Sequence, residues 1–116
     1  MKNSDKIIEA IGLVEEIFDD GRRWGKGEFY NPDTGKYCLV GALRKSESFK
    51  ANRLRVWEDF DDLCLIYCGR TVVSFNDDPV TDFVDIKDFL NYARKMCRWP
   101  SWVVETIGMF KFMLRS

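Results

Sequence analysis

Apolar side chains recur at intervals of three and four residues along most of this chain, and that spacing predicts amphipathic helices. The predicted helices cover residues 4–20, 37–45, 52–67, a segment that Thr81 caps and that runs to Met96, and a last segment after Pro100. Gly21 and Gly69 directly follow two of these segments and are expected to end the helices. The pattern therefore predicts a mainly α fold of about five helices in one domain, residues 1–116.

Two segments break the helical pattern. Residues 71–75, Thr-Val-Val-Ser-Phe, are rich in β-branched and aromatic side chains, so at most a short strand or hairpin is expected there. The turn signal Asn76-Asp77-Asp78-Pro79 follows directly. Residues 21–35 contain several glycines and the sequence Asn31-Pro32-Asp33, which predicts a long loop with a tight turn.

Length and composition agree with one folded domain. The 116 residues are 46% hydrophobic and 15% aromatic, which is too apolar for a disordered chain. Their formal net charge is only −1, yet residues 21–55 carry 9 basic and 3 acidic side chains and residues 56–93 carry 2 basic and 9 acidic ones. Such blocks either neutralise each other within the fold or leave a basic and an acidic face for partners.

The residue inventory limits the chemistry. The chain has no histidine, which excludes Ser-His-Asp and Cys-His catalytic systems. Cys64 and Cys68 form the only closely spaced cysteine pair, too few for a four-thiolate zinc site, and no metal or other cofactor is predicted. No secretory signal or membrane span is recognisable, so a cytoplasmic protein with reduced thiols is expected.

The most distinctive sequence is Tyr37-Cys38-Leu39-Val40-Gly41-Ala42-Leu43, preceded by Trp24 and followed by Phe75-Asn76-Asp77. This order resembles an uncharacterised small-domain family of bacteria and bacteriophages, with a G-W-x-x-G loop, a C-L-x-G-A-L helix and a W-N-D turn. The likeness covers about residues 8–95, and residues 98–116 are expected to form a helical extension. Phe75 stands where the family usually has tryptophan, and Arg23 stands where it has glycine.

The resemblance brings no established activity with it. It does imply a frequent origin on phages and other mobile elements, whose small proteins often bind and block a host protein. We therefore expect a non-enzymatic accessory protein that inhibits a host target, with a defence nuclease, as for anti-CRISPR proteins, as one such target.

An enzyme centred on Cys38 is the alternative. Cys38 lies near the N-terminus of a predicted helix, where the helix dipole lowers a thiol pKa. Asn76 and Asp77 are the other candidate catalytic residues, in a pocket beneath the Trp24 loop. The competing interpretation is that Cys38 is a small core residue and that Asn76 and Asp77 only shape a turn.

Three surfaces are candidates for partner binding. The first is the basic, aromatic loop, the second is an acidic helix face that would mimic phosphates, and the third is a C-terminal aromatic helix that would suit a partner protein or a homodimer. The basic loop comprises Arg22, Arg23, Trp24, Lys26 and Tyr30. The acidic helix face comprises Glu58, Asp59, Asp61 and Asp62, and the C-terminal aromatic helix contributes Trp99 and Trp102.

Nucleic-acid binding through the basic residues 21–55 is a second alternative. Arginine and lysine neutralise phosphates, and Trp24, Phe29 and Tyr30 offer rings for base stacking. The isoelectric point of about 5.5 argues against this as the main role. For Trp24, the simpler interpretation is an anchor that folds back onto the core.

Overall fold

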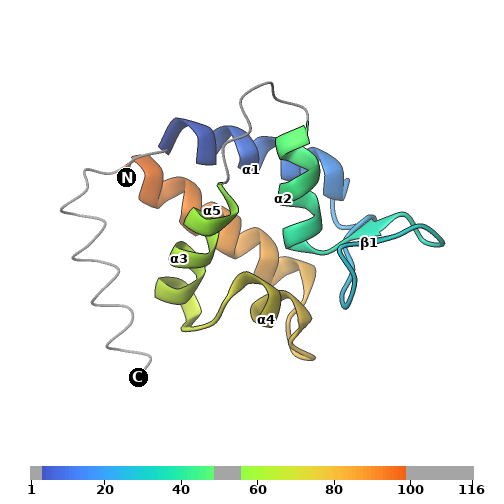
Figure 1. Cartoon of the computed structure of the whole chain (residues 1–116). Coiled ribbons are helices and arrows are strands. Elements are labelled where there is room, and N and C mark those ends of the chain that lie inside the picture. The colour runs from blue at the N-terminus through green and yellow to red at the C-terminus, as the bar shows by residue number, and fades with distance from the viewer. Residues whose placement is uncertain (1–3, 49–55, 99–116) are drawn as a thin grey trace.

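The computed structural model describes residues 4–48 and 56–98, which fold into five helices and one short hairpin (Figure 1). The mainly α prediction is confirmed. The elements are α1 (Ser4–Phe18), β1 (Tyr30–Asn31), β2 (Lys36–Tyr37), α2 (Leu39–Ser48), α3 (Trp57–Cys68), α4 (Val72–Asp77) and α5 (Phe83–Arg98). The last predicted helix, after Pro100, lies outside the described residues. Within the described part, no helix is long and apolar enough to cross a membrane.

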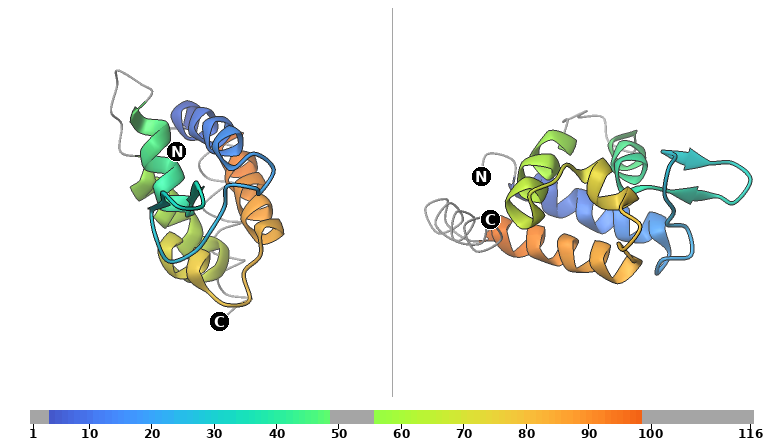
Figure 2. Two further views of the ribbon diagram at one scale, coloured as in Figure 1. Left: turned by 90° about the vertical axis from the view of Figure 1, so that its right-hand side faces the viewer. Right: turned by 90° about the horizontal axis from the view of Figure 1, so that it is seen from below.

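Helices α1 and α5 run antiparallel, side by side, and form the base of the bundle (Figures 1 and 2). α2 packs on α1, and α3 and α4 pack against each other beside α2 and α5. An ion pair between Arg94 of α5 and Glu15 of α1 joins the two base helices at the surface. The hairpin projects from the end of the bundle opposite α3 (Figure 2).

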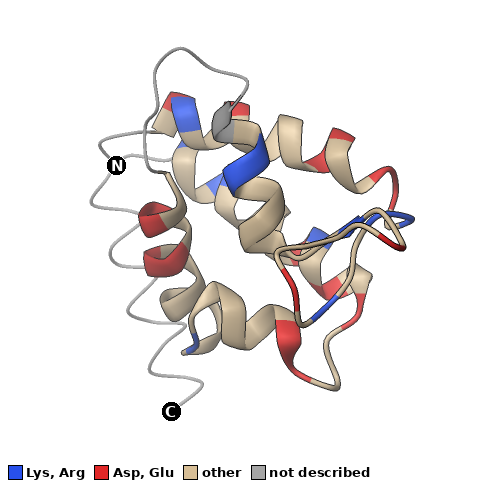
Figure 3. Cartoon of the chain, turned by 45° about the vertical axis from the view of Figure 1, so that its right-hand side comes forward, with Lys and Arg blue, Asp and Glu red and all other residues tan. Residues whose placement is uncertain are grey.

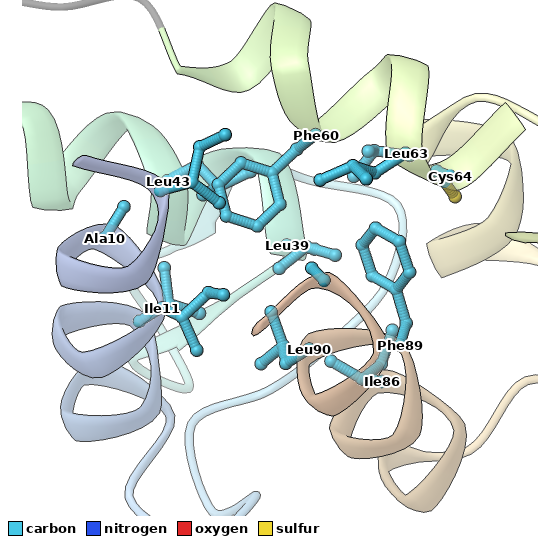
Figure 4. Packing of buried hydrophobic residues seen from close by; sticks show 14 of the residues in the cluster. Ala10, Ile11, Leu39, Leu43, Phe60, Leu63, Cys64, Ile86, Phe89 and Leu90 are labelled. Atoms are coloured by element: carbon cyan, nitrogen blue, oxygen red, sulfur yellow. The ribbon is translucent and has the colours of Figure 1, made fainter. Parts of the chain in front are cut away.

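The core is built from the apolar positions that the helical spacing indicated. Each helix contributes side chains from one face, and the aromatic rings pack edge to face, as Phe60 of α3 does on Phe89 of α5. Figure 4 shows how these side chains meet between α1, α2, α3 and α5. The largest fully buried residues are Phe18, Phe60, Phe89, Ile7, Ile11, Leu39, Leu43, Leu63, Ile86, Leu90, Val14 and Val72.

The expected strand at residues 71–75 is wrong, because this segment forms α4. Its N-cap, Thr71, accepts a hydrogen bond from the backbone N–H of Ser74, and Asp61 of α3 accepts one from the N–H of Val72. Val72 and Phe75 are buried while Val73 and Ser74 are exposed, which is a helical period rather than a strand alternation. Caps supplied by tertiary structure override the β-propensity of the valines.

Helix ends agree with the sequence to within a few residues. Gly69 takes the left-handed conformation, with φ of 76°, and its N–H donates to the carbonyl of Leu65, so it ends α3 as predicted. At α5 the cap lies one residue beyond Thr81. The carbonyl of Asp82 accepts from the N–H of Ile86, and the N–H of Asp82 donates to the carboxylate of Asp85.

The hairpin begins inside the predicted loop of residues 21–35 and ends just beyond it, at Tyr37. Tyr30 pairs with Tyr37 and Asn31 with Lys36 in an antiparallel register. The expected turn is confirmed, since the N–H of Gly35 donates to the carbonyl of Asn31. The strand pairing on either side of that turn had no clear signal in the sequence.

Candidate binding site at the hairpin

Asn76 connects three separate parts of the chain. Its side-chain oxygen accepts hydrogen bonds from the indole N–H of Trp24 (2.7 Å) and the backbone N–H of Leu39 (3.0 Å). Its amide nitrogen donates to the carbonyl of Gly25 (3.1 Å) and to the carboxylate of Asp77 (3.0 Å). The side chain is fully buried. We call Asn76 and these four partners the Asn76 network. It ties residues 22–37, which we call the hairpin segment, to the start of α2 and the end of α4.

Two neighbours strengthen this attachment. Oδ1 of Asp77 accepts a hydrogen bond from the backbone N–H of Gly27 (3.0 Å), and the ammonium of Lys26 donates to the carbonyl of Asp78 (2.6 Å). The same ammonium lies 5.7 Å from the ring centre of Trp24, within the range of a cation–π contact. Asp77 and Lys26, both predicted functional residues, therefore also help to hold the hairpin.

Trp24 is a structural anchor. Its ring packs against Phe83 at 6.1 Å between centroids, and Phe83 packs edge to face on Phe18 at the end of α1. The chain on either side of it pairs with β2, since the N–H of Gly25 donates to the carbonyl of Tyr37 (2.9 Å). This agrees with the interpretation of Trp24 as a core anchor that folds back, rather than as a ring free for stacking.

The close packing around Gly41 explains why the C-L-x-G-A-L pattern has a glycine at this position. A Cβ added at this position would lie 1.8 Å from the carbonyl oxygen of Phe29. The hairpin backbone therefore rests directly on the first turn of α2, and only glycine permits so close an approach.

Cys38 caps the N-terminus of α2. Its carbonyl accepts from the N–H of Ala42 (2.9 Å), and its sulfur lies 3.4 Å from the N–H of Gly41, in the position of a capping hydroxyl. Burial raises the pKa of the thiol above its ordinary value, and the charge of Asp77 adds to this, while the bonds from the Gly41 and Val40 N–H groups oppose it. The net rise leaves the group a neutral thiol near pH 7, contrary to the lowered pKa expected from its place on the helix.

A cleft of about 570 Å³ lies between the hairpin segment and α4. Its lining residues are Gly27, Glu28, Phe29, Tyr30, Cys38, Val73 and Asp77. Three of them are large apolar or aromatic side chains that remain about half exposed: Phe29 (48%), Tyr30 (47%) and Val73 (45%). The lining includes two carboxylates and no basic side chain. We refer to this site as the hairpin cleft.

The aromatic wall of the hairpin cleft is braced from within the protein. Tyr30 packs against Tyr37 in a tilted arrangement with ring centres 4.6 Å apart, and the guanidinium of Arg44 lies 4.7 Å from the ring centre of Phe29. These contacts orient the two rings without burying them. The cleft is therefore walled by side chains that are held in place and still open to solvent.

A family model matches residues 4–96, a stretch that includes the Asn76 network and every residue of the hairpin cleft. The chain belongs to DUF6197, a family of unknown function. This confirms the predicted membership of an uncharacterised small-domain family. No curated protein and no solved structure matches the chain. The DUF6197 assignment brings no activity, so the argument for function rests on the site itself.

The predicted surfaces are not brought together. Arg22 and Arg23 are exposed at the start of the hairpin segment, and Arg22 pairs with Asp19 at 3.4 Å. The acidic residues of α3 lie away from the hairpin, at the other end of the bundle (Figure 3). One of them, Asp61, is committed to capping α4, whereas Glu58 and Asp62 are exposed. Trp99 and Trp102 lie outside the described residues.

The cysteine pair on α3 shares one helix face, as its spacing predicted. The sulfurs of Cys64 and Cys68 are 3.7 Å apart, and burial together with the neighbouring Cys68 raises the pKa of Cys64. Among the described residues, no group of three or more potential metal ligands gathers.

The turn between α4 and α5 is held by Asp78. Its carboxylate accepts from the N–H of Val80 (2.9 Å) and forms an ion pair with Arg70. These two contacts, in that order, lower the pKa of Asp78 below its ordinary value. Asp78 therefore shapes this turn, as the turn signal Asn76-Asp77-Asp78-Pro79 predicted.

Besides the backbone of Gly27, sequence reasoning missed two lining side chains, those of Glu28 and Val73. Glu28 is an isolated acidic residue in a basic stretch, and Val73 belonged to the segment interpreted as a strand. Neither carries a local signal. They meet only because the Asn76 network brings residues about 50 positions apart side by side.

Proposed function

We propose that this protein is a non-enzymatic binding protein that recognises another protein through the hairpin cleft. The observation that carries the proposal is the combination of a firmly anchored hairpin with half-exposed Phe29, Tyr30 and Val73 around one cleft. Apolar area that stays exposed on an ordered segment is typical of recognition surfaces, because little conformational entropy is lost on binding. Aromatic side chains are also enriched at interface centres.

The alternative of an enzyme centred on Cys38 receives less support. Burial raises the pKa of its thiol more than the N–H groups at the start of α2 lower it, and a raised pKa works against a reactive thiolate. Asn76 uses both amide hydrogens and its oxygen within the network, so it has no group left for a substrate. Cys38 and Asp77 line the cleft, whereas Asn76 is not among the lining residues.

Nucleic-acid binding is also less well supported. Lys26 is bonded to the carbonyl of Asp78, and Arg22 is paired with Asp19, which reduces the free positive charge of the loop. The adjoining cleft is lined by Glu28 and Asp77, which would repel phosphates.

The biological form of the proposal follows from the family resemblance. We propose that the partner is a protein of the host cell and that binding inhibits it, as expected for an accessory protein of a phage or mobile element. A defence nuclease is one class of target that fits this role. This part of the proposal rests on association with such elements and adds nothing to the geometry.

Affinity capture with matched variants tests the proposal. The tagged full chain, the variant Phe29→Ala/Tyr30→Ala and the control Val80→Ala/Val84→Ala are each incubated with host lysate, once with and once without nuclease treatment. Val80 and Val84 are more exposed than the cleft residues but do not line the cleft, so the control removes apolar surface elsewhere. The proposal predicts a stoichiometric protein that the wild type and the control retain and the hairpin variant loses. Equal capture by all three would overturn it, as would recovery that disappears with nuclease treatment.

A further inference from the structure

The charge of the hairpin cleft indicates the chemistry of its partner. Glu28 and Asp77 both line the cleft, and the lining contains no lysine or arginine. Oδ1 of Asp77 is occupied by the N–H groups of Gly27 and Asn76, whereas no contact of Oδ2 is found within the described residues. This leaves one carboxylate oxygen of Asp77, and the whole carboxylate of Glu28, for a ligand.

The apolar part of the cleft adds a second requirement. Phe29, Tyr30 and Val73 expose apolar surface, and burying that surface stabilises a complex when the ligand places an apolar group against it. The rings attract cations as well, and the protein already places Arg44 on the ring of Phe29. The volume of 570 Å³ is in the range of sites that enclose a ligand of several side chains, since such sites measure about 300–1,000 Å³.

We infer that the cleft binds an exposed peptide segment of the partner protein in which an arginine or lysine stands beside a large apolar side chain. The cation pairs with Asp77 and Glu28, and the apolar side chain packs on Phe29, Tyr30 and Val73. An acidic segment is rejected, because its carboxylates would lose water against two like charges. This inference rests on the proposed function and specifies the segment that the cleft selects.

Peptide pools test the inference on the full chain. Fluorescent decapeptide pools with random flanks carry a fixed central pair, Arg-Leu, Arg-Ser, Ser-Leu or Glu-Leu, and fluorescence anisotropy measures their binding. The Arg-Leu pool is expected to bind tightest, the Arg-Ser and Ser-Leu pools more weakly, and the Glu-Leu pool weakest. Equal binding of the four pools, no binding of the Arg-Leu pool, or preference for Glu-Leu would overturn the inference. Arg-Ser binding as tight as Arg-Leu would also overturn it, since the site would then be a simple cation site.

Neutralising variants assign the effect to the cleft. Glu28→Gln/Asp77→Asn removes both charges and keeps an oxygen that accepts from Gly27, and Glu58→Gln/Asp62→Asn removes two charges from exposed α3 positions. The cleft variant is expected to bind the Arg-Leu pool about 2- to 30-fold more weakly, as two exposed ion pairs allow, and the α3 variant as wild type. If the double variant does not fold, the single variant Glu28→Gln, at an exposed position, is used instead and is also expected to bind the Arg-Leu pool more weakly than wild type.

Failure of the inference can be told apart from failure of the proposed function. If the captured host protein depends on Phe29 and Tyr30 but is unaffected by neutralising Glu28 and Asp77, the cleft is the binding site and the inferred cationic segment is wrong. If capture does not depend on the aromatic residues at all, the proposed function itself is wrong.

Discussion

Removing the Asn76 side chain tests whether the Asn76 network positions the hairpin. In Asn76→Ala, Trp24, Leu39 and Gly25 lose their side-chain partners together. The Leu39 N–H belongs to a fully buried residue, whereas Trp24 and Gly25 are only partly buried and regain water. With about 1–3 kcal/mol for a buried unsatisfied group and about 0.5–1.5 kcal/mol for each ordinary hydrogen bond, the expected loss is about 2–6 kcal/mol. That is a large share of the roughly 5–15 kcal/mol by which domains are usually stable.

Urea unfolding followed by circular dichroism measures this loss, with Asn91→Ala as the control. Asn91 is exposed on α5 and accepts one hydrogen bond, from Arg94, so its replacement is expected to cost less than about 0.5 kcal/mol. Amide hydrogen exchange adds a local measurement. The N–H of Gly25 donates to the carbonyl of Tyr37, and the N–H of Tyr37 donates to the carbonyl of Arg23. Both amides should therefore exchange faster in Asn76→Ala even if the helices stay folded.

Asn76→Asp separates the accepting from the donating half of the network. It keeps an oxygen for Trp24 and Leu39 but turns a second oxygen toward the carbonyl of Gly25 and the carboxylate of Asp77. The loss should be at least as large as for alanine at neutral pH and should shrink in acid, where protonation restores a donor. A cost below about 1 kcal/mol for Asn76→Ala, with unchanged exchange at Gly25 and Tyr37, would refute the reasoning.

Three further predictions concern the same framework. Gly41→Ala forces the hairpin away from α2 and should cost about 1–3 kcal/mol in urea unfolding. Cys38→Ser should leave stability unchanged or raise it by up to about 1 kcal/mol, since a hydroxyl caps a helix better than a thiol; thermal unfolding measures this. Asp78 has a lowered pKa in the folded state, so its contribution is present above about pH 3.9, the unfolded value, and is lost as the pH falls through the folded pKa. Asp78→Asn should therefore be less stable than wild type at neutral pH and approach it in acid.

Each of these has a control or a contrary outcome. Gly12→Ala is the match for Gly41→Ala, because a Cβ there meets nothing within 4 Å, and it should stabilise α1 by about 0.5–1 kcal/mol. A loss of more than about 2 kcal/mol in Cys38→Ser would contradict the capping role. A constant stability difference between Asp78→Asn and wild type from neutral to acid pH would contradict the assigned pKa shift.

The helices could be predicted because their signal is local. Apolar spacing marks α1, α3 and α5 to within a few residues, Gly21 and Gly69 add a stop signal after α1 and α3, and the fold class follows from these helices. The exception, α4, is six residues long and rests on a cap from Asp61 in another helix. Such a helix cannot be told from a strand by propensity alone, since Val72 and Val73 favour strands.

The candidate site could be predicted only in part. The sequence indicated that Cys38, Asn76 and Asp77 lie near the Trp24 loop, and the structure does bring them together. What local patterns could not show is how these residues are used. The role of Asn76 is set by partners 37 to 52 positions away, and the pKa of Cys38 is set by burial.

Site-directed photocrosslinking tests the central claim, that the hairpin cleft contacts a protein partner. A benzophenone amino acid replaces Tyr30 in one variant and the exposed Val84, which does not line the cleft, in another, and both are irradiated in host lysate. The account predicts one major crosslinked protein from position 30 and none of it from position 84. Crosslinking of the captured protein from position 84 but not from position 30 would contradict the account.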